Sequence, residues 1–391
     1  MAQNVVLYPW FKFFQNLLFW QAVWFLYIQA ELSAAEAIAL YAVYDIATTA
    51  FEVPSGYMSD KLGRRFTLIC SCAASIAGAL CLALGDSFAV FALGQVMFGA
   101  GMAFASGTDS ALLFESLDAD NRAEEIENWE LRGWRFTYAG LALSAPIGGG
   151  MAYWAPSLPF WASAVAFLGM LLVVLRFAEP DRRVQRQTDR ADLMAALRQP
   201  MLMWLFGLGV MAYTLSHLPF VFGQPFISEA LRSFGWQAEA TWISGLVTAT
   251  MMLLSMTASA FAPRLRKRIG FGAMVLLATL MQIALVGVLM ITNSTWAIAL
   301  LFLRMVPDAF SVPFIQARIQ PLVSSETRAT YLSLRSFCAR LVFAGTLFLA
   351  AVKTTDVGQM PYDDIQTVLG GYFVAGLIGW GVLAATLRRV K

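Results

Sequence analysis

The sequence predicts an all-α membrane protein with twelve spanning helices, and three observations support this fold class. Hydrophobic residues make up 59% of the 391 positions and charged residues only 13%, about half the charged fraction of a typical soluble domain. Apolar runs long enough to cross a bilayer recur along the whole chain. The basic residues between these runs fall almost entirely on one side of the membrane when alternate loops are assigned to its two faces.

The apolar runs place the spans in order, with short loops between most of them. Spans are expected at residues 8–30, 34–57, 66–85, 88–115, 131–152, 158–178, 200–228, 239–262, 271–292, 295–320, 329–352 and 365–387. Ser33 and Glu36 predict a capping box that opens the second span. The long polar stretch 179–199 is rich in Arg and Asp, and it predicts a cytoplasmic linker between two six-helix bundles, 1–178 and 200–391.

The distribution of Lys and Arg predicts the orientation. With both termini and every even-numbered loop in the cytoplasm, only Arg232 and Lys353 fall outside. Met1 leads directly into the first span without the basic region and cleavage site of a signal peptide. We therefore expect an integral multi-pass protein of a bacterial cytoplasmic (inner) membrane, with both termini inside.

The most specific motif lies in the loop between the second and third spans. It has the pattern G-x-x-x-D-K-x-G-R-R and consists of Gly56, Asp60, Lys61, Gly63, Arg64 and Arg65. The three cations hold the loop in the cytoplasm, and the second glycine permits a tight reversal. The aspartate can accept hydrogen bonds at the end of its helix. A generic basic loop is the alternative, but the pattern resembles the loop 2–3 signature of the major facilitator superfamily of secondary transporters.

This resemblance implies the major facilitator fold of two pseudo-symmetric six-helix bundles. It also implies that Glu115, at the end of the fourth span, pairs with Arg64 or Arg65 in one gating state. The sequence itself is consistent with two parallel repeats, because residues 135–140 (RFTYAG) in span 5 resemble residues 340–345 (RLVFAG) in span 11. We therefore expect Arg135 and Arg340 to occupy equivalent cavity positions.

Charged residues inside the spans are the first candidates for function. A charge at mid-bilayer is costly, so it normally faces protein or a water-filled cavity. Spans 3, 6, 9 and 12 carry none in their interiors, which fits the family arrangement in which these four helices lie outside. The other spans carry Lys12, Asp45, Glu52, Asp109, Arg135, Arg304, Asp308, Arg335 and Arg340.

Three of these carboxylates, Asp45, Glu52 and Asp308, are candidates for proton coupling. Asp45 and Glu52 are seven residues apart and share a helix face, with Asp45 near mid-membrane. Because a low-dielectric surrounding disfavours a charged carboxylate, Asp45 is the first candidate. A permanent structural pair with an arginine is the alternative for Asp45 and the preferred interpretation for Glu52. Asp308 is expected to pair with Arg304, four residues earlier on the same helix.

Prolines in span 10 predict a local irregularity of the backbone. Pro307 and Pro313 flank Asp308, and each removes a hydrogen bond from the helical ladder. Transporter helices have such irregular backbone where they face a cavity.

Aromatic residues in span 1 and the outer half of span 7 suit a cavity for an amphipathic organic molecule. Together with the intramembrane arginines, the candidate cavity residues are Trp20, Trp24, Tyr213, His217, Arg135, Arg304 and Arg340. Lipid-facing or interfacial placement is the alternative for the aromatic residues.

A motif at the end of span 5 indicates a direction of transport. Residues 145–150 (APIGGG) resemble the antiporter signature G-P-x-x-G-G of facilitator-type drug exporters. Pro146, Gly149 and Gly150 match that signature, whereas Ala145 replaces its first glycine, and the upstream glycines are each one place off. Ordinary close packing of small residues is the alternative.

These features together predict a monomeric transporter in membrane lipid that exports a small organic molecule by proton antiport and alternating access. Proton-coupled uptake by symport is the alternative, and a membrane receptor or lipid scramblase is a remote third. The net charge is only +2, and one histidine and four cysteines show no ligand spacing. With no nucleotide-binding loop or nucleophile–base pair visible, we expect no enzyme activity, cofactor, metal site or nucleic-acid partner.

Overall fold

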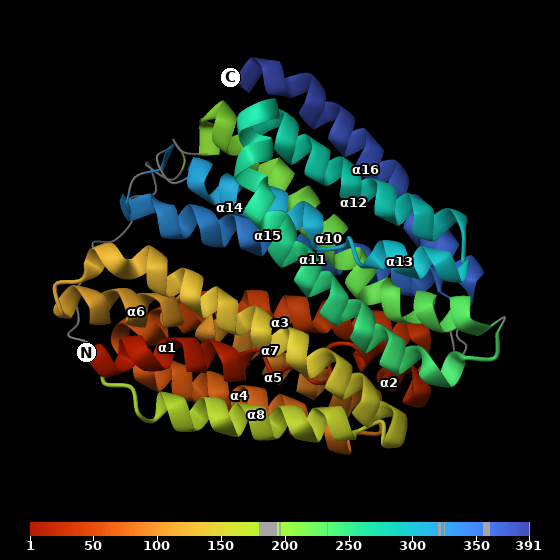
Figure 1. Cartoon of the computed structure of the whole chain (residues 1–391), viewed down its shortest axis with the longest axis horizontal. Coiled ribbons are helices and arrows are strands. Elements are labelled where there is room, and N and C mark those ends of the chain that lie inside the picture. Colours follow the sequence, from red (N-terminus) through yellow and green to blue (C-terminus); the bar gives the residue numbers. More distant parts are fainter. Residues whose placement is uncertain are drawn as a thin grey trace. The chain divides into compact units, whose positions relative to one another are not determined.

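The computed structural model describes residues 1–179, 194, 197–232, 234–319, 322–323, 325–354 and 360–390, apart from a few side chains within the helices. Every regular element of these residues is a helix (Figure 1). Eight helical segments among them are long and apolar enough to cross a membrane, judged by length and composition. The all-α fold class is therefore confirmed.

Nine of the predicted spans are formed by single helices. Spans 2, 3, 5 and 6 are α3 (Ala34–Lys61), α4 (Arg64–Leu84), α7 (Ile126–Trp154) and α8 (Leu158–Val174). Spans 7, 8, 9, 11 and 12 are α10 (Pro200–Arg232), α11 (Ala240–Ile269), α12 (Phe271–Ile291), α15 (Ser325–Lys353) and α16 (Tyr362–Val390).

Three spans are broken into two helices each, which the sequence did not predict for spans 1 and 4. Span 1 consists of α1 (Ala2–Gln15) and α2 (Trp24–Glu31), and span 4 of α5 (Phe88–Ala105) and α6 (Thr108–Ala119). Span 10 consists of α13 (Ile298–Leu301) and α14 (Val306–Ile319). Short 3-10 helices precede α7, α11 and α13 at η1 (Ala123–Glu125), η2 (Gln237–Glu239) and η3 (Thr295–Ala297).

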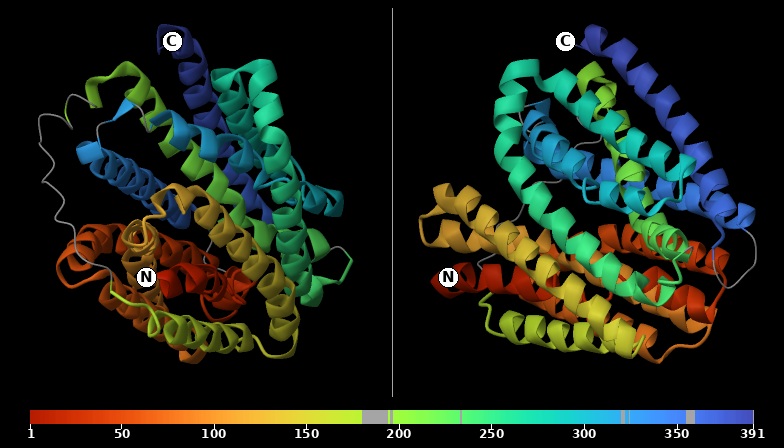
Figure 2. Two further views of the ribbon diagram at one scale, coloured as in Figure 1. Left: turned by 60° about the vertical axis from the view of Figure 1, so that its left-hand side comes forward. Right: turned by 45° about the vertical axis from the view of Figure 1, so that its right-hand side comes forward.

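The helices form two compact units. Unit 1 comprises Met1–Val184 and Thr241–Ala249, and unit 2 comprises Gln185–Ala240 and Thr250–Lys391. Within unit 1, α4 packs against α5 and α8, α3 packs against α5, and α1 packs against α7. Within unit 2, α12 packs against α14 and α16, and α10 packs against α15 and α16 (Figure 2). Residues 180–193 lie outside the described residues, so the linker stays a prediction.

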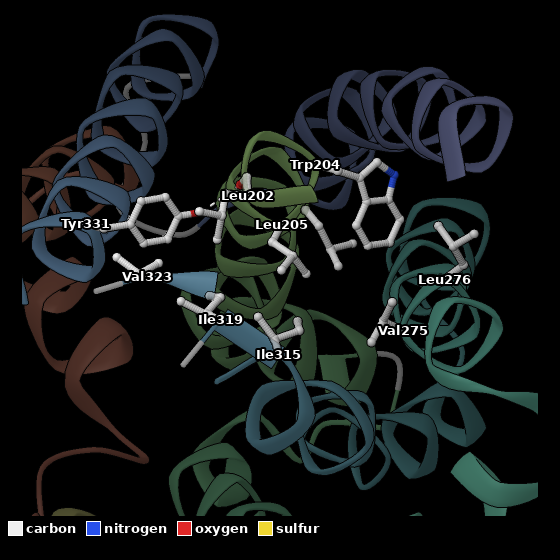
Figure 3. Packing of buried hydrophobic residues seen from close by; sticks show 10 residues of the cluster. Leu202, Trp204, Leu205, Val275, Leu276, Ile315, Ile319, Val323 and Tyr331 are labelled. Carbon is white, nitrogen blue, oxygen red and sulfur yellow. Dashed lines mark hydrogen bonds between the residues drawn. The ribbon is translucent and has the colours of Figure 1, made fainter. Parts of the chain in front are cut away.

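A cluster of buried side chains forms the core of unit 2 where α10, α12, α14 and α15 meet. Figure 3 shows its members Leu202, Trp204, Leu205, Val275, Leu276, Ile315, Ile319, Val323 and Tyr331. The Tyr331 hydroxyl donates a hydrogen bond to the carbonyl of Leu202 at 2.6 Å, which satisfies the polar end of a ring buried among apolar side chains.

The predicted capping box begins α3. The backbone N–H of Glu36 donates to Ser33 Oγ at 3.3 Å, and the backbone N–H of Ser33 donates to Glu36 Oε2 at 3.0 Å. Two N–H groups that a helix start leaves unsatisfied thereby find acceptors, which confirms this prediction.

Side chains satisfy the backbone in the break of span 1. The N–H of Phe19 donates to Ser163 Oγ of α8 at 3.1 Å. Asn16 Nδ2 donates to the carbonyl of Lys12 at 2.8 Å, at the end of α1. In a membrane protein, backbone that leaves the helix needs such internal partners, because lipid supplies none.

The other two breaks have local causes. Span 4 is interrupted at Gly107, whose φ is +75°, a backbone conformation that favours glycine. Span 10 is interrupted over residues 302–305, directly before Pro307, so this proline disturbs the helix as predicted. At Pro313, by contrast, the chain is not interrupted, because α14 continues through this position to Ile319.

Candidate functional site

Arg64 and Glu115 form an ion pair between the start of α4 and α6. Arg64 Nη2 lies 2.9 Å from Glu115 Oε1, and Arg64 Nη1 donates to Ser59 Oγ at 2.7 Å. The two charged side chains are 13% and 18% exposed, so the pair is largely shielded from water. The predicted contact of Glu115 with the loop motif is confirmed, with Arg64 as its partner.

The carboxylate of Glu179 caps the N-terminus of α4, a contact that the sequence did not reveal. Its two oxygens accept hydrogen bonds from the backbone N–H groups of Arg64 and Arg65, at 2.6 and 2.9 Å. A helix N-terminus favours an anion because its first N–H groups lack partners and its dipole is positive there. Gly63 fits beside this cap because its φ is +114° and a Cβ atom would lie 2.7 Å from Glu179 Oε1.

The remaining members of the loop motif lie nearer the surface. Arg65 Nη2 donates to the carbonyl of Leu175 at 2.7 Å, while Lys61 and Gly56 are exposed. The side chain of Asp60 lies outside the described residues, so its predicted role stays a prediction.

Arg122 and Glu125 form an ion pair in the loop before α7, with Arg122 Nη2 2.6 Å from Glu125 Oε2. The Trp129 indole N–H also donates to Glu125 Oε2, at 3.2 Å. The hydrogen bonds from Arg122 and Trp129 lower the pKa of Glu125 to about 2. This carboxylate therefore stays ionised at physiological pH and is not a candidate proton carrier.

Lys12 of α1 pairs with Asp109 in the first turn of α6, with Lys12 Nζ 2.5 Å from Asp109 Oδ2. The side chains are 18% and 7% exposed. Lys12 lies one turn before the break in span 1, and Asp109 lies directly after the break in span 4. The sequence marked both as intramembrane charges but did not pair them, because 97 residues separate them along the chain.

Asp45 is fully buried in α3, with an exposed fraction of 0%. The neighbouring α5 approaches closely, since a Cβ atom on Gly99 would lie 2.8 Å from the backbone nitrogen of Thr48. Glu52, two turns further along α3, is half-buried. The coupling role of Asp45 stays a prediction.

Tyr213 and His217 of α10 form a cluster with Phe343 and Arg340 of α15. The Tyr213 and His217 rings stack with their centres 3.9 Å apart, and the Phe343 ring lies 5.7 Å from His217. His217 Nδ1 lies 2.8 Å from the carbonyl of Tyr213; a carbonyl only accepts, so Nδ1 carries a proton in this contact. Arg340 Nη1 donates to the Tyr213 hydroxyl at 3.2 Å.

Arg304 lies in the break of span 10, with its guanidinium carbon 5.1 Å from the ring centre of Phe220. Asp308 accepts a hydrogen bond from Gln282 of α12 at 2.9 Å. Arg304 lies in the break and Asp308 in the first turn of α14, and the charge of Arg304 acts on the Asp308 carboxylate, so their expected pairing stays a prediction. The partner Gln282 was missed, because nothing in the pattern of span 9 marks a single amide.

The two tryptophans of span 1 have different surroundings. Trp20 is half-buried and stacks on Phe98 with ring centres 5.1 Å apart. Trp24 is 1% exposed and packs against Phe25 and Tyr41. Trp24 is therefore buried in this structure, and its place in the cavity wall stays a prediction.

Arg135 and Arg340 differ in their contacts. Arg135 is exposed on α7 and makes no hydrogen bond or ion pair to any residue that the structure describes. Arg340 is half-buried against Tyr213. Their expected equivalence in a repeat stays a prediction.

The antiporter-like stretch of α7 is a point of close backbone contact within unit 1. A Cβ atom on Gly148 would overlap the carbonyl oxygen of Phe19, in the break of span 1. A Cβ atom on Gly149 would lie 2.6 Å from the carbonyl oxygen of Thr241. Packing therefore suffices to explain why small residues stand here.

The sequence also resembles known proteins. The Major Facilitator Superfamily profile matches residues 10–347. The lactose permease of Citrobacter freundii is 24% identical over 373 residues, which cover 89% of this chain and 84% of the permease.

Two solved structures share the fold. The nucleoside transporter NupG has a TM-score of 0.76 at 14% identity, with 99% of this chain and 100% of that chain covered. The peptide transporter POT in complex with sulfate has a TM-score of 0.79 at 12% identity, with 99% and 95% covered. At such identities the likeness shows the fold alone. Because the family profile matches most of the sequence, the chain belongs to the Major Facilitator Superfamily, and it is a membrane transporter of that type rather than an enzyme.

Proposed function

We propose that this chain is a proton-coupled secondary transporter that carries a small organic molecule by alternating access. The observation that carries the proposal is the gathering of charged and aromatic side chains at the breaks of apolar spans. Lys12 and Asp109 lie beside the breaks of spans 1 and 4, and Arg304 and Asp308 lie at the break of span 10. In secondary transporters, interrupted helices of this kind form the binding sites.

Protons are the proposed driving ion because the spans contain carboxylates and the sequence has no nucleotide-binding loop. Asp45 is the proposed carrier, since a carboxylate enclosed by protein at membrane depth is less costly in its neutral form. Glu52, further along α3, is the proposed relay toward the cytoplasm. Asp308, held by Gln282, is the second candidate carrier.

Export in exchange for protons is the first proposed direction, and it is supported by the resemblance of residues 145–150 to the antiporter signature. Uptake by symport is the second candidate. It is supported by the similarity to proteins named for lactose, nucleosides and peptides, because none of these names describes an exporter.

A transport assay tests this proposal once a ligand is in hand. A thermal-shift screen of the purified chain against metabolites, siderophores and drugs identifies ligands, because binding to the folded state raises the unfolding temperature. Counterflow of a labelled ligand into proteoliposomes then separates a carrier from a receptor or a scramblase. An absence of counterflow for a ligand that binds would contradict the proposal.

The direction of transport can be measured in the same proteoliposomes when the outside solution is made more acidic than the lumen. A symporter moves ligand inward with the protons, whereas an antiporter moves it outward. The sign depends on the coupling and not on the orientation of the reconstituted protein, so a mixed population of orientations suffices.

We also propose that the protein works as a monomer in a cytoplasmic membrane, with both termini inside. Single cysteines at positions 2 and 391 should react with a membrane-impermeant maleimide only after the cells are opened. Labelling of either cysteine in intact cells would contradict this orientation.

A further inference from the structure

Asn4 is a polar side chain without exposed surface in the first turn of α1. Its Nδ2 atom donates to Ser116 Oγ of α6 and to the carbonyl of Ala178, each at 2.8 Å. Its Oδ1 atom accepts from the backbone N–H of Ala178, also at 2.8 Å. One amide thereby joins α1 to the end of α6 and to the chain that follows α8.

The first partner of this amide stands next to the ion pair of the loop motif. Ser116 directly follows Glu115 in α6, and the Glu115 carboxylate pairs with the Arg64 side chain at 2.9 Å. Successive residues of a helix point in different directions, so Glu115 reaches α4 while Ser116 reaches α1. The bond to Ser116 therefore fixes α6 at the place where Glu115 leaves it.

The second partner stands next to the cap of α4. Ala178 directly precedes Glu179, whose carboxylate accepts hydrogen bonds from the backbone N–H groups of Arg64 and Arg65. Glu179 is exposed, and a long exposed side chain has many rotamers, so the cap is firm only where its backbone is held. Asn4 holds this backbone, because it binds both the N–H and the carbonyl of Ala178.

The chemistry of this position calls for an amide. The side chain of Asn4 donates to two oxygen atoms and accepts from one N–H group, and a neutral amide can do both at once. Beside it, Val5 of α1 belongs to a buried apolar cluster with Leu113 and Leu117 of α6. A polar group left unpaired in such surroundings costs free energy, so the bonded arrangement is strongly favoured.

We propose that Asn4 is a positioning residue for the gating contacts of the loop motif: it holds Glu115 and Glu179 against Arg64 at the same time. The hydrogen bonds described for Asn4 reach neither carboxylate, so it acts through the residue beside each of them. Its effect on transport rests on the proposed function. The positioning itself can be measured on the purified chain without any ligand.

The first experiment is a double-mutant cycle that follows thermal unfolding of the purified full chain in detergent. Glu179→Gln should lower the unfolding temperature of the wild-type protein, because the cap of α4 loses its charge. In the Asn4→Ala background the same change should lower it by about half as much or less, because the cap is no longer held in place. Additive effects of the two substitutions would overturn the proposal.

Asn16→Ala is the matched control for this cycle. Asn16 also belongs to span 1 and also donates to a backbone carbonyl at 2.8 Å, but it lies at the opposite end of α1. Its loss should lower the unfolding temperature and leave the effect of Glu179→Gln at full size. An equally reduced effect of Glu179→Gln in this control would show that any weakening of span 1 suffices, and it would overturn the specific role of Asn4.

A second variant separates positioning from stability and serves if Asn4→Ala does not fold. Asn4→Leu together with Ser116→Ala replaces two bonded side chains by apolar groups, which is nearly neutral in a buried apolar seam. This variant should unfold near the wild-type temperature, yet the effect of Glu179→Gln should again be about half or less. A full effect of Glu179→Gln in this background would contradict the proposal.

The second experiment measures counterflow of a ligand from the thermal-shift screen. The variant Asn4→Leu with Ser116→Ala should transport about fivefold more slowly or worse at a normal amount of protein in the membrane. Adding Glu115→Gln should lower the rate little further, because both changes loosen the same ion pair. A loss of stability alone would not produce this coupling between the rates.

A normal transport rate in that variant, or a full further loss on adding Glu115→Gln, would contradict the role of Asn4 in gating. If the wild-type chain shows no counterflow of a ligand that binds, the transport function fails instead. The unfolding cycle then still decides whether Asn4 positions the two carboxylates, so the two proposals can fail separately.

Discussion

Asp109 and Asp308 occupy corresponding places in two broken spans. Each lies in the first turn of the helix that resumes its span, α6 in span 4 and α14 in span 10. Each is held by a side chain from another helix, Lys12 in the first case and Gln282 in the second. Spans 4 and 10 are partners in the proposed six-span repeat, and an acidic group in a first turn is favoured by the helix dipole.

The pair of Lys12 and Asp109 yields the first prediction. Asp109→Asn or Lys12→Gln leaves one largely buried charge without its partner, so each should destabilise the protein by about 3 kcal/mol and abolish transport. Thermal unfolding and counterflow of the purified variants measure the two effects.

The double variant Lys12→Met with Asp109→Leu separates structure from function. Apolar side chains of similar size should recover most of the stability, because a buried ion pair gains little over good packing. Transport should stay lost. If the double variant transports normally, the pair is only structural.

Gly63 yields the second prediction. Gly63→Ala should lower the free energy of unfolding by about 1–3 kcal/mol, because its φ of +114° is strained for alanine and the new Cβ atom would meet the Glu179 cap. Gly56→Ala is the control in the same motif: Gly56 is helical, exposed and without a described heavy atom within 4 Å of an added Cβ. Alanine there should be neutral or stabilising by about 0.5–1 kcal/mol. Equal effects of the two substitutions would contradict this account of the loop.

The loop motif yields the third prediction. We expect Asp60, Arg64 and Glu115 to stabilise the outward-facing state, since they lie at the predicted cytoplasmic ends of spans 2, 3 and 4. Asp60→Asn and Glu115→Gln should lower the transport rate while the amount of protein in the membrane stays the same. Glu125→Gln, which removes an exposed ion pair outside the spans, is the control and should transport normally. Normal transport rates in Asp60→Asn and Glu115→Gln would contradict a role of the loop motif in gating.

The spans could be predicted because a membrane helix must be apolar over a fixed length, and this pattern is local. The break in span 1 could not, because its backbone is satisfied by Ser163, which is far away in the sequence. The breaks of spans 4 and 10 do have local signals, a glycine at 107 and a proline at 307, but such residues also occur in unbroken membrane helices. Pro146 within α7 is an example.

The contacts of the candidate site were predictable only where a family resemblance supplied the partner. The resemblance indicated that Glu115 pairs with the loop motif, and it pairs with Arg64. Glu179 was missed because an acidic residue at the start of a charged linker has no distinguishing pattern. The place of Trp24 could not be decided from the sequence, because an aromatic residue in a span suits a core as well as a cavity; in the structure this side chain is 1% exposed.

Asp45 yields the last prediction and the most direct test of the central claim, that transport is coupled to protons. The measurement uses one proteoliposome preparation and a ligand from the thermal-shift screen, and it compares flux driven by a pH gradient with exchange at equal pH. The wild-type protein should show both activities, and Asp45→Asn should lose the first but keep the second, because exchange needs no net proton movement. Loss of both would recast Asp45 as a substrate or structural residue. A wild-type flux that does not change with the pH gradient would contradict proton coupling itself. An undiminished gradient-driven flux in Asp45→Asn would show that Asp45 does not carry the coupling proton.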